Sequence, residues 1–175
     1  MNNYTAMDIA NYIIWFSKQK FNEGVTNLKL QKLLYFVYGY HLAERDQKLF
    51  NDSIEKWQYG PVVPSVYHAF KDYGVYEIHQ PKSRYRIDMS SGKPVLYAEQ
   101  FEPEIISNDY QTKRIIEKYV SELIKKPAYE LVEETHQHPM WLNFKDKILK
   151  GEKHLQYTDE EIKNFFKNNL TPVFD

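Results

Sequence analysis

The chain has 175 residues and a net charge of −1, from 23 basic and 24 acidic residues, and it contains no cysteine. This length suits one domain with a core of its own, and the lack of cysteine excludes disulfides and thiolate zinc sites and fits a reducing cytoplasm. The even charge balance argues against a nucleic-acid binder. The apolar runs are too short for a membrane span, and we see no signal-peptide pattern.

Two helices are predicted at the start of the chain. Thr5 to Asp8 has the pattern of a capping box, and apolar residues at helical spacing follow it, so a first helix should end near residues 18–20. A second helix should begin after Thr26 or Asn27. Because its apolar residues lie on nearly all sides, we interpret it as a buried central helix.

One side of this expected central helix combines cations, aromatic rings and a glycine. It holds Lys29, Lys32, Phe36, Gly39 and Tyr40. Gly39 removes bulk, so either a partner protein or a neighbouring helix of the same domain can approach closely. We interpret the four larger side chains as candidates for partner binding, with internal packing on Gly39 as the alternative.

A rigid turn framed by prolines follows. Residues 54–59 alternate in a way that predicts a short strand. Gly60 and Pro61 should end this strand, and Pro64 should begin the next helix. Gly74 should close that helix at its C-terminal end.

The aromatic residues around this turn suit two roles. Trp57 should be mostly buried against the central helix, as part of the fold. Tyr59, Pro61 and Tyr67 are candidates for direct contact with a partner. Two prolines fix the backbone there, and a preorganised loop loses less entropy on binding.

The remainder of the chain is predicted to form a hairpin and then helices. Residues 75–103 contain prolines and short apolar pieces, which predict a β-hairpin that turns near Ser91 and Gly92. Helix starts are predicted at Ser107 or Asn108, at Pro127 and at Thr158. Residues 141–149 suggest one more short helix.

The histidines are the main candidates for chemistry. His136 and His138 are the closest pair, but a spacing of two residues turns their rings about 160° apart on a helix, whereas a helical metal pair needs a spacing of four. His136 continues the apolar side of its helix, so we interpret it as a hydrogen-bonded structural residue. The sequence shows no phosphate loop, nucleophile elbow or zinc helix. We therefore predict no catalytic residue, no metal site and no cofactor.

Four segments carry a recognisable spacing. They are Leu28-Lys-Leu-Gln-Lys-Leu-Leu-Tyr-Phe36, Trp57-x-x-Gly-Pro-Val-Val-Pro-x-Val-Tyr67, Tyr73-Gly74 and Leu131-x-x-x-Thr135-His136. Together they resemble the signature of the Panacea domain, a family of antitoxins first described as a domain of unknown function in phage-associated proteins. In that family a Pro-Trp pair follows the histidine closely, whereas here Met140 separates Pro139 from Trp141. The likeness runs from about residue 9 to about residue 141.

The resemblance implies an antitoxin that binds and neutralises a cognate toxin encoded beside it. At least one branch of that family acts as an adaptor that hands its toxin to a protease, so a cytoplasmic protease is a second candidate partner. Some members carry a DNA-binding segment, for which we see no room here. A transcriptional regulator and an uncharacterised enzyme are the remaining alternatives.

The fold that follows is mostly α (α+β), a single compact helical domain with a small antiparallel β element. We expect the Panacea-like domain to span residues 1–150, with the β-hairpin inserted near residues 75–103. Residues 151–175 should form a C-terminal helix that packs on the domain or extends it.

Overall fold

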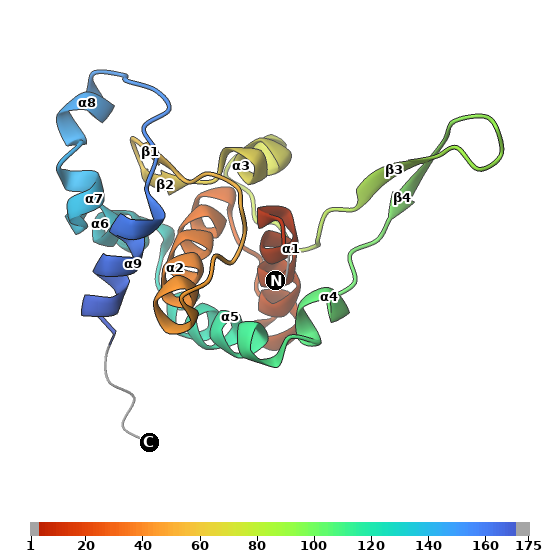
Figure 1. Ribbon diagram of the computed structural model, residues 1–175, viewed down its shortest axis with the longest axis horizontal. Helices are drawn as coiled ribbons and strands as arrows, with labels where there is room; N and C mark the ends of the chain where they lie inside the picture. Colours follow the sequence, from red (N-terminus) through yellow and green to blue (C-terminus); the bar gives the residue numbers. More distant parts are fainter. Residues whose placement is uncertain (1–3, 171–175) are drawn as a thin grey trace.

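Helix α2 (Asn27–Arg45) lies at the centre of the molecule (Figure 1). The computed structural model describes residues 4–170. The helices that pack against α2 include α1 (Ala6–Phe21), α3 (Pro64–Phe70), α5 (Tyr110–Leu123), α6 (Ala128–Gln137) and α9 (Asp159–Asn168). Buried residues occur on every side of α2, which confirms the prediction of a central helix.

Side-chain caps set the helix starts much as the sequence indicates. Thr5 and Asp8 form the predicted capping box of α1, and Thr158 forms the second box at the start of α9. Helix α5 differs, because Asp109 rather than Ser107 or Asn108 accepts the capping hydrogen bond. Each cap satisfies an amide that would otherwise lack a partner at the start of its helix.

The segment around Gly60 forms a small hairpin, where we expected a single strand. Strand β1 (Glu55–Trp57) pairs antiparallel with β2 (Gly60–Val62), and Trp57 lies opposite Gly60. The chain reverses over Gln58 and Tyr59, and Gly60 begins the second strand with a φ of +89°. The first strand ends at Trp57, and Gly60 and Pro61, which we expected to end it, begin a second strand instead.

Helix α3 (Pro64–Phe70) begins at the predicted proline directly after this hairpin. The 3₁₀ turn η1 (Lys71–Tyr73) extends it. Gly74 follows with a φ of +56°, which ends the helical segment.

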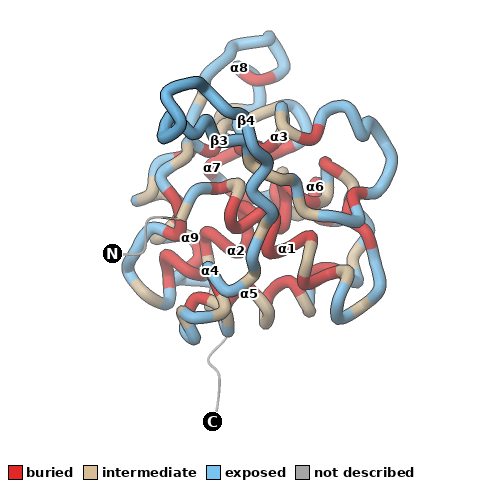
Figure 2. The backbone as a smooth tube through the Cα atoms, turned by 90° about the vertical axis from the view of Figure 1, so that its right-hand side faces the viewer, coloured by how far each residue is buried: buried red, intermediate tan, exposed pale blue. Residues whose placement is uncertain are grey.

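A second hairpin projects from the helices as an arm (Figure 1). Strand β3 (Arg84–Asp88) pairs antiparallel with β4 (Val95–Glu99), and the turn contains Ser91 and Gly92, as predicted. Short helix α4 (Glu104–Ser107) returns the chain to the helices. In Figure 2 the arm is drawn in the colour of exposed residues, whereas α1 and α2 are largely buried. The predicted fold class, mostly helical with small antiparallel β elements, is confirmed.

Two short helices, α7 (Pro139–Leu142) and α8 (Lys145–Leu149), lie between α6 and α9. Trp141 of α7 is buried and donates a hydrogen bond from Nε1 to the carbonyl oxygen of Trp57 at 2.9 Å. Trp57 itself is only half-buried. Its ring packs against Tyr67 of α3, whereas the Trp141 side chain lies in the interior. The expectation that Trp57 packs against the central helix stays a prediction.

The mixed side of α2 is covered by the chain itself. Phe166 of α9 lies so close to Gly39 that a Cβ atom there would be 2.3 Å from the ring. Lys32 and Phe36 are buried, so the interpretation of their side chains as a partner surface requires correction. These side chains are buried because α9, which is distant in the sequence, packs on α2 beside Gly39.

The two flanking residues of that side also have internal partners. Lys29 is half-buried and donates from Nζ to the carbonyl oxygen of Ile124 at 2.5 Å. The half-buried ring of Tyr40 stacks on Tyr119, with 3.6 Å between centroids and 4° between planes. Internal packing on Gly39, the alternative interpretation, describes this side of α2.

Within residues 4–170, no helix is long and apolar enough to cross a membrane.

Candidate partner-binding groove

Two consecutive polar residues of α2 hold the first hairpin in place. Gln31 accepts a hydrogen bond from the Val63 amide at 2.9 Å, and Lys32 donates from Nζ to the Pro61 carbonyl oxygen at 2.9 Å. Both side chains are buried. Buried polar groups need such partners, so these bonds fix the hairpin backbone against the central helix.

The network continues to α3 through Asn27. Gln31 donates from Nε2 to Asn27 Oδ1 at 3.0 Å, and Asn27 donates from Nδ2 to the carbonyl oxygen of Tyr67 at 3.0 Å. One run of α2 residues therefore positions the backbone of both the hairpin and α3.

Lys32 lacks the usual environment of a lysine. It is completely buried, and this burial lowers the pKa of its ammonium group to about 7. A neutral amine can still donate to the Pro61 carbonyl, so the hydrogen bond does not depend on the charge. Lys32 thus acts as a long internal hydrogen-bond donor.

The opposite side of the hairpin contacts α6 and α7. A Cβ atom on Gly60 would lie 2.5 Å from Thr135 Oγ1, so the glycine permits close contact with α6. His136 is half-buried, and its Nε2 lies 3.1 Å from the Gln58 carbonyl oxygen. Its ring stacks on Trp141 with 3.7 Å between centroids. His136 therefore has a hydrogen-bonding partner and a stacking partner within the fold, and burial lowers its pKa.

Three segments of the sequence signature therefore meet at one turn. They come from α2, from the β1–β2 hairpin, and from α6 with α7. Met140 is buried beside this junction and Trp141 still reaches it, so the extra residue after Pro139 is accommodated.

The rigid hairpin presents a groove of about 430 Å³ on the surface. We name it the aromatic groove and define it by Leu28, Trp57, Tyr59, Val62, Tyr67 and Lys71. The Trp57 ring meets the Tyr67 ring edge to face at 4.9 Å between centroids. Trp57 Nε1 donates to Glu55 Oε2 at 2.8 Å, which holds the indole in place. Tyr59 is 62% exposed at the rim.

The predicted partner-binding residues divide between this groove and the interior. Tyr59 and Tyr67 line the groove, whereas Pro61 is buried and supplies a backbone acceptor beneath it. Leu28 and Lys71 are groove residues that sequence reasoning missed. They lie at the start of α2 and after α3, and the sequence gives no signal that these two helix ends adjoin.

The chemistry of the groove suits binding. Its defining residues are aromatic or aliphatic apart from Lys71, and the amide side chains of Asn27, Gln31 and Gln58 also line it. Among residues 4–170, no group of three or more His, Asp or Glu side chains is placed to hold a metal ion. Aromatic residues held rigid in a partly apolar recess are typical anchors of protein interfaces.

Comparison with known proteins places this arrangement in a family. The model of the family described as "Antitoxin SocA-like, Panacea domain" matches residues 30–142. The chain belongs to this family. The match covers the β1–β2 hairpin, the arm and the α6–α7 junction.

A curated relative shares part of the chain. Antitoxin SocA of Caulobacter vibrioides (strain NA1000 / CB15N) is 46% identical over 50 residues. This alignment covers 29% of the present chain and 27% of the relative, so the chain spans about a quarter of that protein's length. No solved structure matches significantly.

Proposed function

We propose that this protein is an antitoxin that neutralises a cognate toxin by direct protein–protein binding in the cytoplasm, without catalysis. Membership of a family described as antitoxins supports a toxin as the partner. The observation that carries the proposal is the aromatic groove, which is lined by rings of the β1–β2 hairpin and of α3, both fixed by buried hydrogen bonds.

We place the toxin contact at this groove for energetic reasons. Interface energy concentrates in a few aromatic or cationic anchors, each worth about 2 kcal/mol or more. Trp57, Tyr59 and Tyr67 provide such anchors, and Lys71 adds a cation at the edge. Because the hairpin is already ordered, binding there loses little conformational entropy.

Growth rescue tests the proposal. The toxin encoded beside this protein is co-expressed with wild-type protein, Tyr59→Ala, or Tyr129→Ala. Tyr129 on α6 is a matched control, because it is 62% exposed, as Tyr59 is, but lies outside the groove. We expect Tyr59→Ala to lose rescue and Tyr129→Ala to keep it. Equal rescue by both variants would place the toxin contact elsewhere.

A second candidate function is that of a proteolytic adaptor. The same groove would then present the toxin to a protease, so groove variants give the same result in a growth assay. Measurement of toxin lifetime separates the two functions, because an adaptor shortens it and an occluding antitoxin does not.

A further inference from the structure

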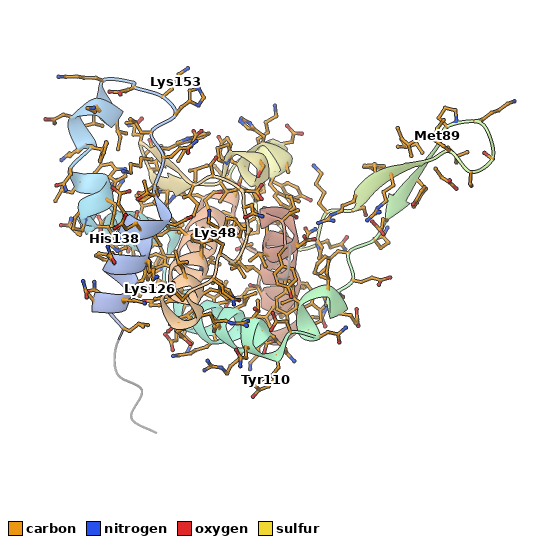
Figure 3. The ribbon with its side chains drawn as sticks, in the orientation of Figure 1. Lys48, Met89, Tyr110, Lys126, His138 and Lys153 are labelled. Carbon is orange, nitrogen blue, oxygen red and sulfur yellow. The ribbon has the colours of Figure 1, made fainter. Side chains whose placement is uncertain are left out.

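The β3–β4 arm is firmly attached at its base and contacts little else. Asn11 of α1 donates to the Lys82 carbonyl oxygen at 3.0 Å and accepts from the Lys82 amide at 2.9 Å. Arg84 forms an ion pair with Asp8. Beyond this base the arm extends away from the helices, and Met89 lies at its far end (Figure 3). The arm is thus held in position but projects into solvent.

The two faces of the arm have different chemistry. Residues two apart on a strand, and residues opposite each other across a pair, share one face. The register therefore places Tyr85, Ile87, Leu96 and Ala98 on one face. The other face carries Arg84, Arg86, Asp88, Val95, Tyr97 and Glu99, and Arg86 pairs with Glu99 at 2.7 Å. One face is wholly apolar, whereas the other mixes charged residues with Val95 and Tyr97.

The apolar face is exposed to solvent in the described chain. The exposed fractions are 68% for Tyr85, 64% for Ile87 and 64% for Leu96. A lone two-stranded hairpin is only marginally stable in water, and contiguous exposed apolar surface marks interaction sites. Covering this face with another surface would therefore stabilise the arm.

The charge of the arm indicates what that surface is. Residues 82–99 contain four basic and two acidic residues, a net charge of +2 in a chain whose total is −1. Arg84 pairs with Asp8 of α1 and Arg86 pairs with Glu99, so Lys82 and Lys93 are the cations of the arm for which the described residues provide no ion pair. The turn carries Ser90, Ser91, Gly92 and Lys93, so the leading end of the arm is too polar for a bilayer interior. Charge complementarity favours a protein surface with acidic residues around an apolar centre.

We propose that the apolar face of the arm is a second docking surface for the toxin, separate from the aromatic groove. The toxin surface that fits it is apolar at the centre and carboxylate-rich at the edge. The inference rests on the proposed antitoxin function and adds a chemical description of the partner.

Affinity measurements on the purified complex test the arm. Ile87→Ser/Leu96→Ser alters the apolar face, and Val95→Ser/Tyr97→Ser is the matched control on the other face of the same strand pair. We expect the first pair to raise the Kd for the toxin roughly tenfold or more, as loss of interface anchors does. The control should stay within about threefold. Circular dichroism and thermal unfolding should show both variants folded, because the helices do not rest on the arm.

Lys93→Glu provides an independent measurement that leaves the strands intact. We expect slower association with the toxin and a weaker dependence of that rate on salt, since electrostatic attraction mainly affects the on-rate. An unchanged rate and salt dependence would contradict an acidic partner surface.

Each alternative occupant has its own outcome. If wild-type protein binds the toxin and Ile87→Ser/Leu96→Ser binds equally well, the arm proposal is overturned while the antitoxin function stands. If the wild-type protein does not bind the toxin, both proposals fail. Self-association that the same double variant abolishes in sedimentation would assign the arm to a second copy. Co-sedimentation of the protein with phosphatidylglycerol vesicles, lost in that variant, would assign the arm to a lipid surface, and either result overturns the proposal.

Discussion

Gly60 illustrates how one residue serves both turn and packing. Its φ of +89° is accessible to glycine, and the absence of a side chain leaves room for Thr135. Lys32 also lies close, since its Cε atom would be 3.1 Å from a Cβ atom at Gly60. The junction of the signature segments therefore depends on a residue without a side chain at this position.

Substitution of this glycine should separate strain from steric clash. We expect Gly60→Ala to lower the free energy of unfolding by about 2–4 kcal/mol, from backbone strain and contact with Thr135. Gly151→Ala is the control, because Gly151 has a φ of +84° and open space around it. The control should lose about 1 kcal/mol, from strain alone. Urea unfolding measures both losses, and equal losses would show that the Thr135 contact costs nothing.

His138 should give the protein a defined sensitivity to acid. It is buried, its Nδ1 lies 2.9 Å from the Tyr35 hydroxyl, and burial lowers its pKa from 6.5 to about 4. The unfolded chain therefore takes up this proton near pH 6.5, whereas the folded chain resists it until about pH 4. Stability from this group is complete above pH 6.5 and is lost as the pH falls toward 4, by up to about 3 kcal/mol.

The test compares unfolding free energies between pH 7 and pH 4. We expect His138→Asn to show a flatter loss than wild type, although His41 and His136, whose pKa values burial also lowers, retain part of the slope. An identical slope in the variant would exclude His138 as a source of acid sensitivity.

Helix caps could be predicted from single residues and their spacing, whereas the burial of side chains could not. Both capping boxes and the role of Pro64 follow from side-chain type and spacing alone. Lys32 is different, since lysine is rarely buried and no local pattern shows that its amine reaches the Pro61 carbonyl. The sequence likewise does not show that Trp141 is more deeply buried than Trp57, because exposure depends on which distant elements pack nearby.

At the scale of elements, the pairing of α2 with α9 fixes one side of the core. Phe166 packs edge to face with the rings of Tyr35, Phe36 and Tyr40, and it lies directly over Gly39. A glycine within a helix costs roughly 1 kcal/mol relative to alanine. Here that cost allows an aromatic ring of another helix to approach the backbone.

A double-mutant cycle should reveal this complementarity. We expect Phe166→Ala to reduce the free energy of unfolding by about 3–5 kcal/mol, through loss of a buried ring. Gly39→Ala should also destabilise the wild type, because its Cβ would collide with Phe166. In the Phe166→Ala background the same glycine substitution should be neutral or stabilising, since the collision is gone and helix propensity improves.

Chemical denaturation of the four proteins gives the coupling energy. Additive losses would contradict direct contact between Gly39 and Phe166. The half-buried neighbour Phe165 offers a further comparison, and Phe165→Ala should cost less than Phe166→Ala.

Helices and strands with a regular spacing of apolar residues could be predicted, whereas the contacts between them could not. The helices and the arm follow from apolar spacing and turn residues. The β1–β2 hairpin was missed because three-residue strands carry too little pattern to distinguish a turn from a stop. The sequence left open whether a partner protein or a neighbouring helix packs on Gly39, because it does not indicate that α9 contacts α2.

At the scale of the whole molecule, two surfaces differ in rigidity and chemistry. The aromatic groove rests on a network of buried hydrogen bonds, whereas the arm extends from one anchored base. Two separate contacts on one partner raise affinity through effective concentration, provided that the partner spans both. Such an arrangement suits tight, stoichiometric occlusion of a toxin.

Occlusion makes a quantitative prediction for the purified proteins. With no protease present, toxin activity should fall linearly as this protein is added and should reach its minimum at a fixed molar ratio, because tight binding without turnover consumes one surface per toxin. Tyr59→Ala, which removes a groove anchor, should shift the titration to a shallow curve, while Tyr129→Ala should reproduce the wild-type end point. Toxin that stays fully active beside an excess of wild-type protein, yet disappears from cells once a protease is present, would instead establish delivery for degradation as the mechanism.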